Sequence, residues 1–249
     1  MKKFWAACLA ALFCVSAFAC GGASGEMSAA VSAEMAETPV KLVYFPGEKL
    51  KVGGGSLKVT REDGSVSEEK LTEEMCEADL SAPGKKRVKV RAFGGETEFE
   101  VFVASRRLCK SRSVQEAIDE AEDGDVLWLA PGTYHEGLVF DGKKLTLIGD
   151  GSGSLFIGPK KYEELAEEGG ALFVLKNGAE VTLRKITLCV DSRLLKRAKM
   201  SKGDLAAMKL SEGSGALLQE CRISGFPKGK EILRDRESMV ESEKLVYQP

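Results

Sequence analysis

Residues 177–188 (NGAEVTLRKITL) and residues 212–223 (EGSGALLQECRI) align with each other without a gap. Each segment starts at a glycine-containing corner and continues with short apolar runs. The alignment pairs apolar positions of the two segments: Leu183 with Leu218, Ile186 with Cys221, and Leu188 with Ile223. Such self-similarity is typical of solenoids, in which each coil stacks on the previous one. We therefore predict that these side chains share one core and that Cys221 is a core residue.

Similar apolar runs, separated by corners that contain Gly or Asn, extend this pattern toward the N-terminus. They occupy residues 126–129, 138–140, 145–148, 155–157, 171–175, 181–183, 186–188, 208–210, 216–218 and 221–223. Many short strands at short spacing favour a parallel β-helix. We expect a domain over residues 108–226 with about four coils, and a C-terminal tail or cap over residues 227–249.

A helix is predicted at the start of this domain. One apolar stripe at helical spacing is formed by Val114, Ala117, Ile118 and Ala121. Ser113 and Glu116 have capping-box spacing, which satisfies backbone donors at a helix start. Gly124 is placed to end the helix in the left-handed conformation.

Three motifs follow one another at the start of this domain. They are Ser113-Val114-Gln115-x-Ala117-Ile118, Gly124-Asp125-x-x-x-Leu129-Ala130-Pro131-Gly132-Thr133-Tyr134-x-Glu136 and Leu145-Thr146-Leu147-Ile148-Gly149. Together they resemble the N-terminal cap of right-handed parallel β-helix proteins of the pectin-lyase-like fold, and of the pectinesterases in particular. The resemblance implies a helix that covers the open end of the solenoid, where core and strand edges would otherwise be exposed.

The pectinesterase resemblance implies catalysis by two Asp, an Arg and Gln side chains on the outer face of the solenoid. Residues 205–208 match one landmark of the family, but Asp204 stands where Gln is expected. Residues 221–226 match a second landmark, but Pro227 and Lys228 stand where Gln-Asp is expected. Lysine cannot replace a carboxylate that acts as acid, base or nucleophile. We therefore assign no catalytic residue, and name Asp191 and Asp204 as the first to test if the protein is an enzyme.

Residues 39–104 are predicted to form a separate small β-sandwich. Two hairpin signals, Asp63-Gly64 and Gly94-Gly95, lie between segments in which apolar and polar residues alternate. About six strands in this length favour a two-sheet sandwich. The pieces Tyr44-x-x-Gly47-Glu48-x-Leu50, Leu57-x-Val59 and Gly94-Gly95-x-Thr97-x-Phe99-x-Val101-x-Val103 resemble a bacterial immunoglobulin-like domain. This resemblance implies a spacer or adhesion module.

Residues 1–19 have the organisation of a secretory signal peptide. Lys2 and Lys3 precede an uncharged run that ends in Ala17-Phe18-Ala19. Cys20-Gly21-Gly22 follows and resembles a bacterial lipobox, which implies that Cys20 is acylated and anchors the protein in a lipid bilayer. The alternative is ordinary cleavage and secretion. Residues 20–38 are rich in small residues and Glu, and are predicted to be a flexible tether.

Composition narrows the classes of ligand. The formal net charge is −2, whereas nucleic-acid binders carry a basic surface, so no nucleic-acid partner is expected. With one histidine and widely spaced cysteines, we predict no metal site and no cofactor. Disulfide pairing stays open for the four cysteines that follow the leader and Cys20, namely Cys76, Cys109, Cys189 and Cys221.

The leading hypothesis is a non-catalytic, lipid-anchored envelope protein that binds a polysaccharide, or a host or envelope surface component, through its β-helix. The alternatives are a carbohydrate-active enzyme of pectinesterase or polysaccharide-lyase type, and a structural spacer. The fold does not choose among them. An outward cluster of two carboxylates and an Arg would favour the enzyme, and exposed aromatic side chains in a groove would favour sugar binding.

Overall fold

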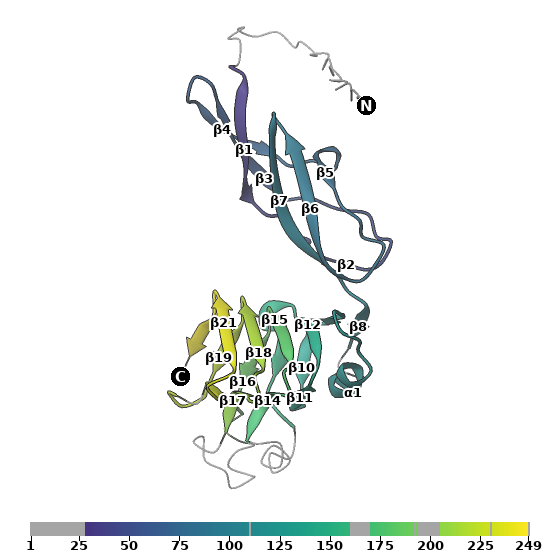
Figure 1. Cartoon of the computed structure of the whole chain (residues 1–249), viewed down its shortest axis with the longest axis vertical. Coiled ribbons are helices and arrows are strands. Elements are labelled where there is room, and N and C mark those ends of the chain that lie inside the picture. The colour runs from purple at the N-terminus through teal and green to yellow at the C-terminus, as the bar shows by residue number, and fades with distance from the viewer. Residues whose placement is uncertain are drawn as a thin grey trace, which may run out of the picture.

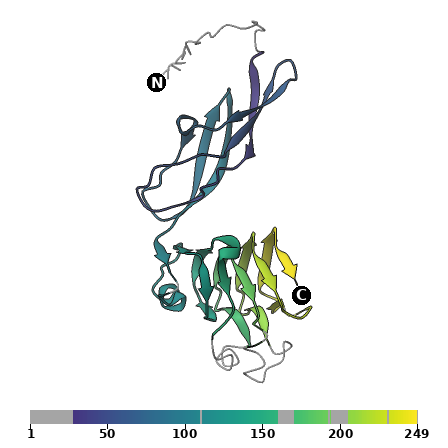
Figure 2. The same cartoon turned by 180° about the vertical axis from the view of Figure 1, so that it is seen from behind.

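The computed structural model of the chain describes residues 28–109, 111–159, 170–191, 193, 205–229 and 231–248. Two β-rich units lie end to end, as Figures 1 and 2 show from opposite sides. The first is a two-sheet sandwich and the second is a stack of parallel coils. This arrangement confirms the predicted all-β class. No helix within the described ranges is long and apolar enough to cross a membrane.

The sandwich is built from a three-stranded and a four-stranded sheet. The first sheet has the order β1 (Ala30–Glu37), β3 (Ser56–Arg61) and β4 (Val66–Lys70). The second has the order β2 (Val43–Tyr44), β7 (Gly95–Val103), β6 (Gly84–Ala92) and β5 (Cys76–Glu77), with the 3-10 turn η1 (Glu73–Met75) before β5. Leu57 and Val59 of the first sheet share one buried core with Val88, Val90 and Val101 of the second. The alternation of apolar and polar residues in the sequence places these side chains on the inner faces of the two sheets.

The structure differs from the predicted tether in residues 30–37, which form β1. This strand pairs antiparallel with β3, and Ala33 lies opposite Val59. Ala33 is buried, and Met35 packs partly against the same core. The segment has few large apolar side chains with which to fold alone. As an added strand it needs little apolar surface, because β3 supplies its hydrogen-bond partners.

The second unit is a parallel β-helix whose strands form three sheets. The long sheet has the order β21 (Met239–Glu243), β18 (Gly215–Gln219), β15 (Glu180–Arg184), β12 (Lys144–Ile148), β9 (Val126–Leu129) and β8 (Arg106–Leu108). The second sheet contains β10 (Gly132–Tyr134), β13 (Ser154–Phe156), β16 (Thr187–Cys189), β19 (Arg222–Ser224) and β22 (Val246–Gln248), and the 3-10 turn η2 (Gly151–Gly153) precedes β13. The third contains β11 (Leu138–Asp141), β14 (Ala171–Lys176), β17 (Ala206–Leu210) and β20 (Ile232–Arg234).

The register of the coils agrees with the alignment of the two sequence segments. Leu183 lies opposite Leu218 on the long sheet, and Leu188 lies opposite Ile223 on the second sheet. Cys221 is buried, and desolvation raises the pKa of its thiol to about 11. The four cysteines in the described residues are all free thiols.

The β-helix continues beyond residue 226, where the sequence suggested a tail or cap. Strand β20 completes a fourth coil within the described residues, and β21 and β22 begin a fifth. Val240 and Leu245 of this last coil pack partly against the core. The coil looked irregular in sequence because, at the end of the stack, most of its side chains face water.

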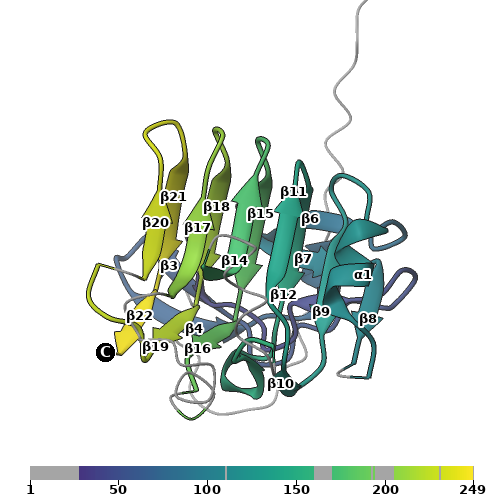
Figure 3. The same ribbon diagram turned by 90° about the horizontal axis from the view of Figure 1, so that it is seen from below.

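Helix α1 (Val114–Asp119) lies beside β8 and β9 at the first coil (Figure 3). Ile118 of this helix is fully buried in the core of the β-helix. Ser113 is the predicted N-cap and accepts a hydrogen bond from the backbone N–H of Glu116. Two more donors at the helix start are satisfied by Glu136, whose carboxylate accepts from the backbone N–H of Val114 at 2.9 Å and from that of Gln115 at 3.2 Å. The resemblance motif includes this glutamate, and the structure shows its cap role.

Gly124 does not end the helix, which stops at Asp119. It has a φ of 88° in the turn before β9, and its N–H donates to the carbonyl of Lys144 at 2.7 Å. The left-handed conformation of Gly124 was therefore predicted correctly, but it forms the turn into the first coil and does not end the helix.

Candidate functional site

The outer face of the long sheet carries rows of side chains that run across the strands. Residues that are paired in register lie side by side on neighbouring strands. Each row therefore contains one residue from each of β12, β15, β18 and β21. The first row is Lys144, Glu180, Gly215 and Met239, and the second is Thr146, Thr182, Leu217 and Glu241. The third row is Ile148, Arg184, Gln219 and Glu243.

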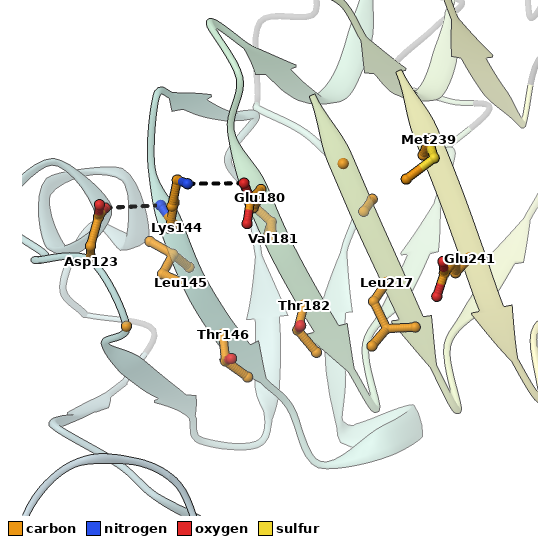
Figure 4. Close-up of a pocket in the computed structure, with 13 residues that line it drawn as sticks. Asp123, Lys144, Leu145, Thr146, Glu180, Val181, Thr182, Leu217, Met239 and Glu241 are labelled. Carbon is orange, nitrogen blue, oxygen red and sulfur yellow. Dashed lines mark hydrogen bonds and ion pairs between the residues drawn. The ribbon is translucent and has the colours of Figure 1, made fainter. Parts of the chain in front are cut away.

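The first two rows line an open groove of about 570 Å³ (Figure 4). At one side, Lys144 Nζ donates to Glu180 Oε1 at 2.9 Å, and this hydrogen bond raises the pKa of Lys144. Both side chains are more than half exposed, so the pair contributes little to stability. Two hydroxyl-bearing side chains and one apolar side chain, Thr146, Thr182 and Leu217, follow along the second row.

The groove is therefore lined mostly by apolar surface, to which Leu217 and the exposed Met239 contribute, with two hydroxyl groups along it and charges at its ends. Glu241 lies in the same row as the threonines, on the last strand. The described lining residues include neither an arginine nor an aromatic side chain. The backbone groups of β12, β15 and β18 are engaged in the parallel ladder, so a ligand over these three strands must be recognised by side chains.

The sandwich packs against the long sheet next to this groove. Figure 1 shows that the arrowheads of β18 and β21 point toward the sandwich. Phe102 and Ala104 of the sandwich side form a small buried cluster with Val126 and Ile148. The guanidinium carbon of Arg184 lies 5.2 Å from the centre of the Phe102 ring. A second hollow, of about 300 Å³, lies at this junction.

The residues singled out from the sequence do not meet in the groove. Cys20 and Asp204 lie outside the described residues. Asp191 follows β16 and accepts a hydrogen bond at Oδ1 from the backbone N–H of Arg193 at 2.8 Å. It is not among the residues that line the groove. Lys228 lies with Glu231 and Tyr247 in a hollow beside the last coil.

Within the described ranges, no group of three or more His, Cys, Asp or Glu side chains is placed to hold a metal ion. The groove itself was missed by the sequence analysis. A signal for it was present, because the aligned segments place Thr182 and Leu217 at matching positions that alternate with buried ones. Matching outward positions in successive coils form a row on the surface.

No protein-family model matches this chain, and no curated protein sequence matches it. Among solved structures, the chain is similar to a pectin methylesterase mutant crystallised in complex with a hexasaccharide. The sequence identity is 15%, the TM-score is 0.40, and the match covers 50% of this chain and 50% of the esterase chain. The match thus spans about half of that enzyme, and it is a likeness of fold.

Proposed function

We propose that this protein is an exported envelope protein that binds a polysaccharide, without cleaving it, along the outer face of the long sheet. The observation that carries the proposal is the groove formed by the first two rows of side chains. Its surface is fixed by four hydrogen-bonded parallel strands, so little ordering is needed on binding.

An extended glycan suits this groove because the same kind of contact recurs from strand to strand. Successive residues of a row are about 4.8 Å apart, the spacing of paired strands. Thr146 and Thr182 offer hydroxyl groups that both donate and accept hydrogen bonds. Leu217 and Met239 offer an apolar patch for the carbon face of a sugar ring, at a place where the described lining has no aromatic side chain. A ligand rich in hydroxyl groups that lies across the strands would match this series.

The chemistry of the groove supports binding without catalysis. Of the three carboxylates in the lining, Asp123 accepts a hydrogen bond from the backbone N–H of Lys144 at 3.3 Å and Glu180 is paired with the Lys144 side chain. The third, Glu241, lies two strands away from Glu180 in a different row. A carboxylate nucleophile needs a neighbouring group that activates it or keeps it ionised. Lys144 is the one cation in the described lining and is already paired with Glu180, and that lining lacks the arginine that the pectinesterase resemblance implies.

The sandwich is proposed to be an immunoglobulin-like spacer between the anchor and the β-helix. Opposite charges on its outer face are paired across β6 and β7, with Lys85 bound to Glu100 at 2.7 Å and Arg87 bound to Glu98 at 3.4 Å. Such solvated pairs favour a soluble outer surface over an apolar docking face. A spacer of this kind would hold the groove away from the membrane.

The first prediction concerns the groove. Thr182→Lys places a long charged side chain across the second row and is expected to weaken polysaccharide binding about ten-fold or more, by blocking the ligand. Thr133→Lys is the matched control, because Thr133 is an exposed threonine on β10 of the second sheet. Candidate glycans come from an array probed with the mature chain, and affinities from calorimetry.

Equal loss in both variants, or no glycan bound by the parent, would contradict the groove assignment. The same preparations are incubated with methylated pectin and acidic glycans. Turnover that is abolished by Asp191→Asn or Asp204→Asn would overturn the proposal and favour the enzyme alternative.

The second prediction concerns the anchor. The proposal that Cys20 is acylated rests on the sequence Ala17-Phe18-Ala19-Cys20-Gly21. The mature protein is expected to enter the detergent phase on phase separation, and Cys20→Ala is expected to move it to the aqueous phase, because the acyl chains are its membrane anchor. Mass spectrometry that finds an unmodified N-terminal residue would favour ordinary secretion.

A further inference from the structure

The cleft at the junction of the two units has a different chemistry from the groove. It is lined on one side by the loop over residues 40–48 of the sandwich and on the other by residues of the β-helix. Ligand sites occur preferentially at domain interfaces. Four basic side chains line it (Lys41, Arg107, Arg184 and Lys185) against two acidic ones (Glu48 and Asp150).

The charges in the cleft are unevenly paired. Lys41 Nζ lies 2.7 Å from Glu48 Oε2, so these two charges neutralise each other. On the β-helix side, one carboxylate forms ion pairs with two cations. Glu220 Oε1 lies 3.0 Å from Arg184 Nη2, and Glu220 Oε2 lies 4.0 Å from Lys185 Nζ. With Asp150 also on that side, the three cations Arg107, Arg184 and Lys185 face two carboxylates, so an excess of one positive charge remains.

Arg107 is the basic side chain with the most available donors. Its guanidinium carbon lies 4.7 Å from the centre of the Trp128 ring, and the Phe45 ring packs edge-on against Trp128 with centroids 6.1 Å apart. No ion pair among the described residues includes Arg107, whereas the nearby Arg106 and Arg112 both pair with Glu120. Stacking engages the face of a guanidinium and leaves its in-plane N–H donors for a carboxylate or sulfate.

The backbone that carries the other two cations is also held in place. Lys185 has a φ of 53°, a left-handed conformation that is uncommon for lysine. Gly149 N–H donates to the carbonyl of Arg184, and Gly151 N–H donates to the carbonyl of Lys185, each at 2.8 Å. The side chain of Arg184 is only 14% exposed. The backbone at both residues and the side chain of Arg184 are thus held in place before any ligand arrives.

We infer that this junction cleft binds the carboxylate or sulfate group of an acidic saccharide, with Arg107 as the main anion contact and Lys185 as the second. That the ligand carries an anionic group is inferred from the charges and hydrogen-bond donors of the cleft. That this ligand is a saccharide rests on the proposed function. Because both units line the cleft, the bound ligand also bridges them.

The test uses the full mature chain and calorimetry with four probes: a galacturonate tetrasaccharide, a chondroitin sulfate tetrasaccharide, an uncharged cellotetraose and inorganic sulfate. At least one acidic tetrasaccharide is expected to bind more tightly than cellotetraose, and more weakly as NaCl is raised. Arg107→Gln and Lys185→Asn are each expected to weaken this binding about ten-fold, the effect of losing one charge-assisted contact. Asparagine is used at position 185 because it tolerates the left-handed conformation.

Arg87→Gln is the matched control, since Arg87 is an exposed arginine of the sandwich outside the cleft, and it is expected to leave binding unchanged. Thermal melts of all variants identify any that fail to fold. Two results would overturn the inference: acidic saccharides that bind equally well to Arg107→Gln and Lys185→Asn, or binding of inorganic sulfate alone.

The Thr182→Lys variant separates this inference from the proposed function. Loss of acidic saccharide binding in Arg107→Gln but not in Thr182→Lys supports the cleft even if the groove binds nothing. Loss in Thr182→Lys alone supports the groove and overturns the cleft.

Discussion

Ile118→Asp is expected to destabilise the β-helix by about 4 kcal/mol, because it buries an unpaired carboxyl group in an apolar core. Ile118 is fully buried, in contact with the core that runs through the coils. The stripe that holds it also contains Val114 and Ala117, which offer no hydrogen-bond partner through their side chains. The measurement is thermal unfolding of the mature chain, where a shift of roughly 10 °C is expected for a unit of this size.

Ile118→Val is the matched control, since it removes one methylene and keeps the site apolar. Its expected cost is about 1 kcal/mol. The sandwich has its own core, so a second, unshifted transition serves as an internal reference. A melting curve of Ile118→Asp that matches the parent would mean that α1 does not cover the core in solution.

Gly149→Ala is expected to destabilise the β-helix by about 3 kcal/mol, through overpacking at a corner of the second coil. A Cβ atom at Gly149 would lie 2.7 Å from Ser154 Cβ and closer still to the carbonyl oxygen of Lys185. That oxygen cannot move away freely, because it accepts the hydrogen bond from Gly151 N–H at 2.8 Å. Chemical denaturation of the mature chain gives the change in free energy of unfolding.

Gly215→Ala provides the comparison on the same β-helix. No heavy atom lies within 4 Å of a Cβ placed at Gly215, and its φ is not in the left-handed region. The change is expected to be within about 0.5 kcal/mol, with a slight gain from the reduced entropy of the unfolded chain. If both alanine variants unfold alike, the close approach at Gly149 is not a constraint on the fold.

The sequence predicted the elements whose signals are local. The apolar stripe through Ile118 and the N-cap at Ser113 fixed the position of α1, because helix periodicity and capping involve residues within a few positions of one another. The alignment of the two solenoid segments fixed the register of Leu183 and Leu218, because stacked coils repeat the same inward positions.

Two segments escaped the sequence analysis for one shared reason. Residues 30–37 have no aromatic and few large apolar side chains, and residues 227–249 are rich in charge, so these compositions predicted a flexible tether and an irregular tail. Each contributes outer strands, β1 to the sandwich and β20, β21 and β22 to the β-helix. An edge strand obtains its hydrogen bonds from the neighbouring strand, so it can form with little apolar surface of its own.

The sequence by itself determined the two units, the cap helix and the stacking of the coils, since these follow from periodicity and corner residues. Only the tertiary structure decided the candidate sites. The groove takes one residue from each of four strands that are far apart in the chain, such as Thr146 and Glu241. The cleft depends on how the sandwich meets the β-helix, where Phe45 reaches Trp128 and its partner Arg107. These residues are far apart in the sequence, so no local sequence pattern predicts that they meet. Their contacts are set by the packing of one unit against the other.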